Sequence, residues 1–190
     1  MATIPEVTIM GKSGFRYKQS QKLKPSEFVD AFLPFAEQTQ HKTGISKLAI
    51  LAQAAWESGW NKSSPGWMFF GVKDNDGVNG NEQLLKTFEY SRRPDLKFPE
   101  ILSITPVIRN GEKYFKYVIM DYFRKYNSPG ECFADHADFF FKYNRYDKAI
   151  EVRSDPLRFI EEIAKAGYAT GPNYADALKL VVQTIQKHLI

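Results

Sequence analysis

The chain has 190 residues, which fits one domain with a short arm, because domains usually run to about 100–200 residues. A content of 43% hydrophobic and 15% aromatic residues can form a packed core and argues against disorder. The net charge of +4 suits an anionic partner such as nucleic acid, a membrane surface or bacterial wall, but equally an ordinary soluble protein. Cys132 is the only cysteine, which excludes an internal disulfide and a multi-cysteine metal site.

Neither a membrane span nor a secretory signal is visible. The longest apolar stretch, Leu48 to Trp56, is interrupted by Gln53 and is far shorter than the roughly 20 residues of a membrane helix. Met1 to Gly14 lacks the charged and apolar regions of a signal peptide. We therefore expect no membrane insertion, synthesis in the cytoplasm, and access to any external target by export, injection or lysis.

Residues 1–24 show no clear period and predict an extended N-terminal arm, followed by one domain at 25–190. Ser26 is the expected N-cap of the first helix, and Pro34 predicts a kink or a break into a helix pair. A second helix follows Gly44 and ends at Gly59. Its apolar residues recur at the spacing of one buried face: Ile45, Leu48, Ala49, Ala52 and Trp56.

After this helix the sequence consists of short β-favouring runs separated by Gly, Asn, Asp and Pro, which predicts a β lobe at about 68–120. The pair Asn110-Gly111 between two of these runs is a strong hairpin signal. The runs themselves are Leu84 to Tyr90, Ile101 to Arg109 and Tyr114 to Met120.

Helices resume after the lobe. Ser128 begins one with a capping box that includes Pro129 and Glu131, and Asp155-Pro156 begins another. The last helix has a buried stripe of Leu178, Val181, Val182, Ile185 and Leu189. The order predicts an α+β fold, mainly helical, in which a helical body and a β-hairpin lobe form a substrate cleft.

Glu57 is the residue that best suits chemistry. It lies in the last turn of an apolar helix, near the negative end of the helix dipole and beside aromatic residues. Both surroundings disfavour the ionised carboxylate and raise the pKa, as a general acid near neutral pH requires. A solvated glutamate at a helix end is the alternative that this one residue leaves open.

The segment Ala52-Gln53-Ala54-Ala55-Trp56-Glu57-Ser58-Gly59-Trp60 resembles the signature of glycoside hydrolase family 73, in which an Ala-Gln-Ala run leads to a catalytic Glu-Ser-Gly-Trp. Four further segments resemble family elements in the family's order, with Met68 and Gly171 standing where the family usually has Asn and Asp. They are Phe70-Gly71-Val72-Lys73, Thr87-Phe88-Glu89-Tyr90, Tyr122 to Ala137, and Ala166-Gly167-Tyr168-Ala169-Thr170-Gly171-Pro172-Asn173-Tyr174. The resemblance implies a lysozyme-like fold.

The same resemblance implies roles for individual residues. Glu89 would supply a second carboxylate from the β lobe, and Phe70, Tyr168 and Tyr174 would line the substrate site. Gly171, at the position before Pro172, would serve as the N-cap of the last helix at a cost of about a few tenths of a kcal/mol.

All three tryptophans, Trp56, Trp60 and Trp67, lie close to Glu57 in sequence. Flat rings with N–H donors suit stacking on sugars, so Trp60 and Trp67 are candidates for contact with glycan, whereas core packing explains Trp56 better. His136 lies one turn after Cys132, a spacing that suits a packed core pair better than a metal site. We expect Arg92 and Arg93 to lie in a solvated loop rather than to bind the anionic groups of a ligand.

The family resemblance implies an endo-β-N-acetylglucosaminidase that cuts the β-1,4 bond between N-acetylglucosamine and N-acetylmuramic acid in peptidoglycan, with no metal or organic cofactor. Glu57 would protonate the leaving oxygen, and Glu89 would orient water or stabilise the developing charge, with help from the substrate's acetamido group as an alternative. The expected partner is the peptidoglycan glycan strand, bound by a monomer. The sequence leaves open an immunity protein or a delivery apparatus.

Two rival functions stay open at this point. A lytic transglycosylase also uses one glutamate in a lysozyme-like fold but adds no water, and a wall-binding structural component would keep the cleft without turnover. A nucleic-acid binder is a distant third, because the basic residues are spread along the chain and form no known motif.

Overall fold

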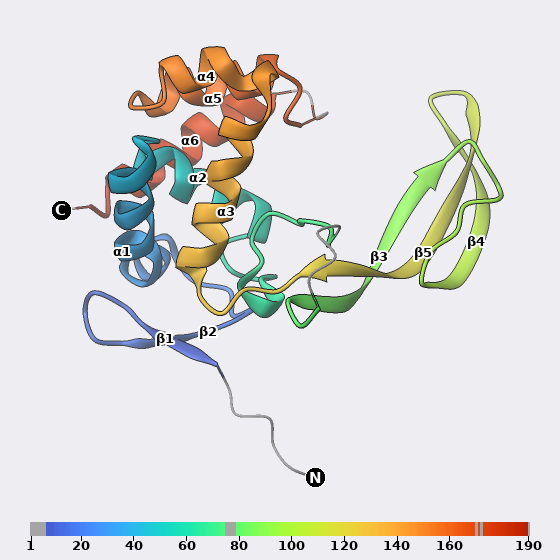
Figure 1. Ribbon diagram of the computed structural model, residues 1–190, viewed down its shortest axis with the longest axis horizontal. Helices are drawn as coiled ribbons and strands as arrows, with labels where there is room; N and C mark the ends of the chain where they lie inside the picture. The colour runs from blue at the N-terminus through green and yellow to red at the C-terminus, as the bar shows by residue number, and fades with distance from the viewer. Residues whose placement is uncertain (1–6, 75–78, 170, 172, 190) are drawn as a thin grey trace, which may run out of the picture. The chain divides into compact units, whose positions relative to one another are not determined.

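The computed structural model describes residues 7–74, 79–169, 171 and 173–189 (Figure 1). Two compact units are present: unit 1 comprises Met1–Phe70 and Tyr126–Ile190, and unit 2 comprises Gly71–Lys125. Helices precede and follow a β-rich segment, so the predicted α+β class is confirmed. Thr170 and Pro172, which belong to one of the segments that resemble the family, lie outside the described residues.

Unit 1 holds the α-helices of the described chain. Its elements in order are β1 (Thr8–Met10), β2 (Arg16–Lys18), α1 (Pro25–Thr43), α2 (Lys47–Ser58), a 3₁₀ turn (Pro65–Trp67), α3 (Pro129–Lys142), a second 3₁₀ turn (Asn144–Tyr146), α4 (Asp147–Glu151), α5 (Pro156–Lys165) and α6 (Tyr174–Gln186).

Helix α1 differs from its prediction in two respects. It begins at Pro25 rather than after Ser26, and the backbone N–H of Lys24 donates to the Glu27 carboxylate at 2.8 Å. Proline suits this first position because its missing N–H would have no helical partner there. The predicted break at Pro34 is wrong, since α1 continues through it to Thr43. Its buried residues, such as Phe28 and Phe32, hold the helix against the core and outweigh the local cost of the proline.

Helix α2 is the centre of unit 1 and packs against α1, α5 and α6. Every residue from Ala49 to Ala55 is buried, and the helix ends as predicted at Gly59, whose φ is 60°. The backbone N–H of Trp60 donates to Ala55 at 2.7 Å, and that of Gly59 donates to Trp56 at 3.2 Å. This is the Schellman pattern, in which a left-handed glycine closes the last turn.

The segment 1–24, predicted as an extended arm, contains the two-stranded sheet β1-β2 and holds the loop that follows α2. The fully buried Asn61 donates from its amide to the carbonyls of Lys18 and Gln21, both at 2.9 Å. The backbone N–H of Leu23 donates to the carbonyl of Trp60, also at 2.9 Å. Both Trp60 and Asn61 have positive φ, a conformation that surrounding bonds must hold in place.

The later helix starts are partly as predicted. The hydroxyl of Ser128 accepts the backbone N–H of Glu131, and Asp155 caps α5 by accepting from Leu157 and Arg158. The Glu131 carboxylate, however, accepts the backbone N–H of Asn127 rather than that of the cap residue.

The predicted N-cap of the last helix is wrong. Helix α6 begins at Tyr174 with Asn173 at the cap position, so Gly171 lies two residues too early to fill that role. The buried stripe of α6 is confirmed for Leu178, Val181, Val182 and Ile185. It is wrong for Leu189, which is partly exposed and lies beyond the end of the helix at Gln186.

Unit 2 is built on a three-stranded antiparallel sheet with the order β3 (Glu82–Ser91), β5 (Glu112–Arg124), β4 (Glu100–Arg109). All three predicted strands are confirmed, although each is longer than its apolar run. Asn110 and Gly111 both have positive φ, 49° and 79°, as the predicted two-residue hairpin requires. Glu89 lies opposite Tyr117 in the register of β3 and β5, so the two share one face of the sheet.

Within the part of the chain that the structure describes, no helix combines the length and the apolar character needed to cross a membrane.

Candidate active site

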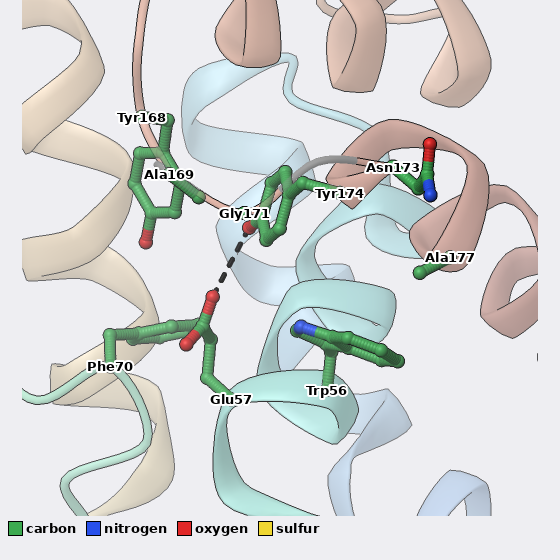
Figure 2. Close-up of a pocket in the computed structure, with 9 residues that line it drawn as sticks. All are labelled: Trp56, Glu57, Phe70, Tyr168, Ala169, Gly171, Asn173, Tyr174 and Ala177. Atoms are coloured by element: carbon green, nitrogen blue, oxygen red, sulfur yellow. Dashed lines mark hydrogen bonds between the residues drawn. The ribbon is translucent and has the colours of Figure 1, made fainter. Parts of the chain in front are cut away.

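A pocket of about 650 Å³ opens in unit 1 where α2 ends, a volume within the usual range of about 300–1,000 Å³ for small-molecule sites. Three segments supply its lining: the end of α2, Phe70, and the turn that leads into α6. The lining residues are Trp56, Glu57, Phe70, Tyr168, Ala169, Gly171, Asn173, Tyr174 and Ala177 (Figure 2). The pocket thus brings together four predicted residues that are far apart in sequence: Glu57, Phe70, Tyr168 and Tyr174.

Glu57 is the only charged residue among those lining the pocket as described. Its side chain is exposed to the pocket, yet enough protein surrounds the carboxyl group that burial raises its pKa above the ordinary value. The hydrogen bond from Tyr174 acts in the opposite direction and is the smaller effect. A raised pKa keeps the proton on the carboxyl to a higher pH, which is the state a general acid needs.

The hydroxyl of Tyr174 connects Glu57 to the core. It donates to Oε1 of Glu57 at 3.2 Å and accepts a long hydrogen bond of 3.5 Å from the side-chain amide of Gln53 (Figure 2). Because Gln53 occupies an oxygen lone pair, the Tyr174 proton is directed at the carboxylate. Burial raises the pKa of Tyr174, so the phenol stays a donor.

The sequence interpretation missed this role for Gln53, which it noted only as an interruption of an apolar run. The available signal was a polar residue one helical turn before the candidate acid, on a helix otherwise fit for burial.

A second tyrosine is fixed from helix α3. The hydroxyl of Tyr168 lies 2.7 Å from Nε2 of His136, and the His136 ring stacks on Phe70 with centroids 3.6 Å apart. Burial lowers the pKa of His136 to about 3, so the imidazole is neutral in ordinary buffers. The packed-core interpretation of His136 and Cys132 is confirmed by their burial, but His136 also fixes two lining residues, which the sequence did not indicate.

The three tryptophans are placed differently from expectation. Trp67 is 0% exposed and packs edge-on against Phe32, so the prediction that it touches glycan is wrong. Trp56, assigned to the core, is 48% exposed and lines the pocket, so that assignment is also wrong. Trp60 is partly exposed and packs against Phe28, outside the lining residues. Its contact with glycan stays a prediction.

Glu89 belongs to unit 2, where it lies on strand β3. The ammonium group of Lys73 lies 3.4 Å from the Glu89 carboxylate and 2.5 Å from that of Asp121, above the ring of Phe123. Exposed ion pairs of this kind contribute about 0–1 kcal/mol.

The nearby arginines of the lobe form exposed pairs. Arg92 pairs with Glu112, and Arg93 with Asp95, in keeping with the interpretation of a solvated loop.

Comparison with known proteins gives the family. The family model described as mannosyl-glycoprotein endo-beta-N-acetylglucosaminidase matches residues 33–187. The chain belongs to this glucosaminidase family. The match contains every residue that lines the pocket, and the predicted resemblance to glycoside hydrolase family 73 is confirmed.

Relatives of this glucosaminidase include proteins called peptidoglycan hydrolase FlgJ. The one from Pseudomonas aeruginosa is 28% identical over 85% of this chain and 37% of its own length. The one from Vibrio parahaemolyticus is 30% identical over 85% of this chain and 48% of its own length. The glucosaminidase chain therefore spans less than half of these curated relatives.

A solved structure is similar over nearly its full length. The crystal structure of a peptidoglycan hydrolase mutant from Sphingomonas sp. A1 matches with a TM-score of 0.61 and 28% identity, covering 86% of this chain and 97% of that one.

We predict that Tyr174→Phe raises the pKa of Glu57 further. The variant removes the hydroxyl that stabilises the ionised carboxylate, and leaves the burial that disfavours it. Titration of the Glu57 side-chain carboxyl by NMR measures the change. Tyr168→Phe is the matched control, because its hydroxyl contacts His136 instead, and should leave the Glu57 pKa unchanged. An unchanged or lower Glu57 pKa in Tyr174→Phe would contradict the role given to the hydrogen bond from Tyr174 to Glu57.

Proposed function

We propose that this glucosaminidase hydrolyses peptidoglycan at the β-1,4 bond between N-acetylglucosamine and N-acetylmuramic acid, with Glu57 as the general acid. The observation that carries the proposal is the lone Glu57 carboxyl in a pocket, its pKa raised by burial. The relatives described as peptidoglycan hydrolases support the choice of substrate.

The acid step follows from the surroundings of Glu57. The protonated carboxyl donates to the glycosidic oxygen as the bond breaks and the sugar ring gains oxocarbenium character. The carboxylate that is left accepts the Tyr174 hydroxyl, which stabilises the new charge. Because the acid must start protonated, turnover falls as the pH rises through the raised pKa of Glu57.

Glu89 is the proposed second carboxylate. Its role would be to orient the attacking water or to stabilise the developing positive charge from the β lobe. The ammonium group of Lys73 lies 3.4 Å from the Glu89 carboxylate, so this side chain has a charged partner on the β lobe. Assistance by the substrate's own acetamido group is the alternative for the same step.

A lytic transglycosylase is the second candidate function. The specific observation in its favour is that the described pocket contains one carboxylate only, which is enough for a reaction that adds no water. The two reactions leave different sugar ends, so their products separate them.

The proposal also covers where and how the chain acts. We place its substrate in the bacterial wall, outside the cytoplasm, and propose that it works as a monomer. The route of delivery, and any immunity protein, would follow from the genes that neighbour this one.

Glu57→Gln should lose activity on purified walls by roughly 10²–10⁴-fold, because the amide keeps the size of the side chain but has no acidic proton. Turbidity loss of wall suspensions measures this, and circular dichroism checks the fold. Glu37→Gln, an exposed position on α1 paired with Lys47, is the matched control and should keep full activity. Residual activity above about a tenth of wild type would refute the assignment of the acid.

Glu89→Gln should lower the same activity by less, on the order of tenfold, because water can still be placed by the acetamido group while nothing replaces the acid. Glu82→Gln is a matched control: it lies on the same strand, but seven residues earlier and thus on the opposite face. Full turnover in Glu89→Gln would remove Glu89 from the mechanism and leave the role of Glu57 intact.

Digested peptidoglycan should carry N-acetylglucosamine at its new reducing ends, because water completes the proposed reaction. Mass spectrometry of the released fragments, with and without borohydride reduction, identifies these ends. Fragments that end only in anhydro-muramic acid would instead establish the transglycosylase.

A further inference from the structure

The indole of Trp56 is the feature that the proposed acid mechanism does not use. Residues 49–55 of α2 are buried, and so is Ser58, so that Trp56 and Glu57 are exposed side by side at the end of the helix. Trp56 is 48% exposed. Trp56 also lines the pocket next to Glu57, and ligand pockets are lined predominantly by hydrophobic and aromatic side chains.

Two residues of α6 and its cap line the pocket together with Trp56. Asn173 and Ala177 line the same pocket and lie one turn apart at the start of α6 (Figure 2). Ala177 is small, and the Asn173 side chain is exposed and carries both a donor and an acceptor. Figure 2 shows the nitrogen-bearing edge of the indole turned toward Glu57.

The chemistry of this part of the pocket indicates the class of ligand. Aside from Glu57 the described lining residues are uncharged, so they offer no cation for a phosphate or a carboxylate. An aromatic face next to amide and phenol groups suits a ring with an apolar C–H face and polar substituents. A neutral N-acetylhexosamine ring has both.

We propose that Trp56 is a sugar-binding platform, on which one N-acetylhexosamine ring stacks next to the bond that Glu57 attacks, with Asn173 at the rim. This inference rests on the proposed function for the position of the bond, but the binding of the sugar does not depend on turnover. The platform adds affinity for the glycan and has no part in proton transfer.

The test measures binding separately from catalysis. In the Glu57→Gln protein, which should not turn over, we would titrate N-acetylglucosamine tetramer (chitotetraose) by calorimetry and follow tryptophan emission. Adding Trp56→Ala should weaken binding by roughly tenfold, as expected for the loss of one aromatic stack. Trp56→Phe should restore part of the affinity but remove the sugar-induced change in emission.

Phe141→Ala is the matched control, because Phe141 is also 48% exposed but lies on α3, outside the lining residues. It should bind the tetramer as the parent does. In the active chain, Trp56→Ala should raise KM on walls by a similar factor with little change in kcat, whereas a disturbed fold would lower kcat and the melting temperature.

Each outcome separates the two proposals. Unchanged affinity and unchanged KM in Trp56→Ala would overturn the platform and leave the wall hydrolase standing, and so would an equal loss in Phe141→Ala. Tetramer binding that depends on Trp56 in a wild-type chain with no wall hydrolysis would support the platform and refute the proposed function. If the parent does not bind the tetramer, an unchanged KM on walls overturns the platform by itself.

Discussion

The burial of helix α2, followed by its abrupt end at Gly59, is the constraint on which the site depends. Neighbouring helices bury the helix from Ala49 to Ala55, so after its first two residues only the last turn can meet solvent. The Schellman bonds fix where the turn stops. Residues 18–23 then hold the left-handed loop beyond it. The proposed acid is positioned by the core rather than by a flexible loop.

The same burial sets the electrostatics of the pocket. Glu57 is surrounded by aromatic and small residues, and two phenols whose pKa values are raised by burial stay neutral beside it. Without a neighbouring cation in the lining, desolvation outweighs the one hydrogen bond to the carboxylate. Two buried polar side chains hold these phenols in place. Gln53 contacts the hydroxyl of Tyr174, and His136 contacts that of Tyr168.

The carboxylate of Glu89 in unit 2 has a different environment from that of Glu57. Glu89 shares Lys73 with Asp121, which lies closer to the ammonium group. A partly exposed pair of this type contributes little to stability. Burial raises the pKa of the Glu57 carboxyl in unit 1, whereas the Glu89 carboxylate in unit 2 lies beside a lysine.

The sequence by itself determined the elements whose signals are local. The strands and the Asn110-Gly111 turn follow from residue type, as do the end of α2 at Gly59 and the cap at Asp155, because backbone geometry there depends on adjacent residues. The family motifs likewise predicted that Glu57, Tyr168 and Tyr174 belong to one site, and all three line the pocket.

Only the tertiary structure decided which side chains are buried. Trp56 and Trp67 lie near the same acid in sequence, yet one is exposed in the pocket and the other lies in the core. The continuous helix through Pro34 and the bond from His136 to Tyr168 likewise depend on packing between distant segments. A periodic pattern shows that a helix has a buried face, but the neighbours that cover each turn are set by contacts far away in the chain.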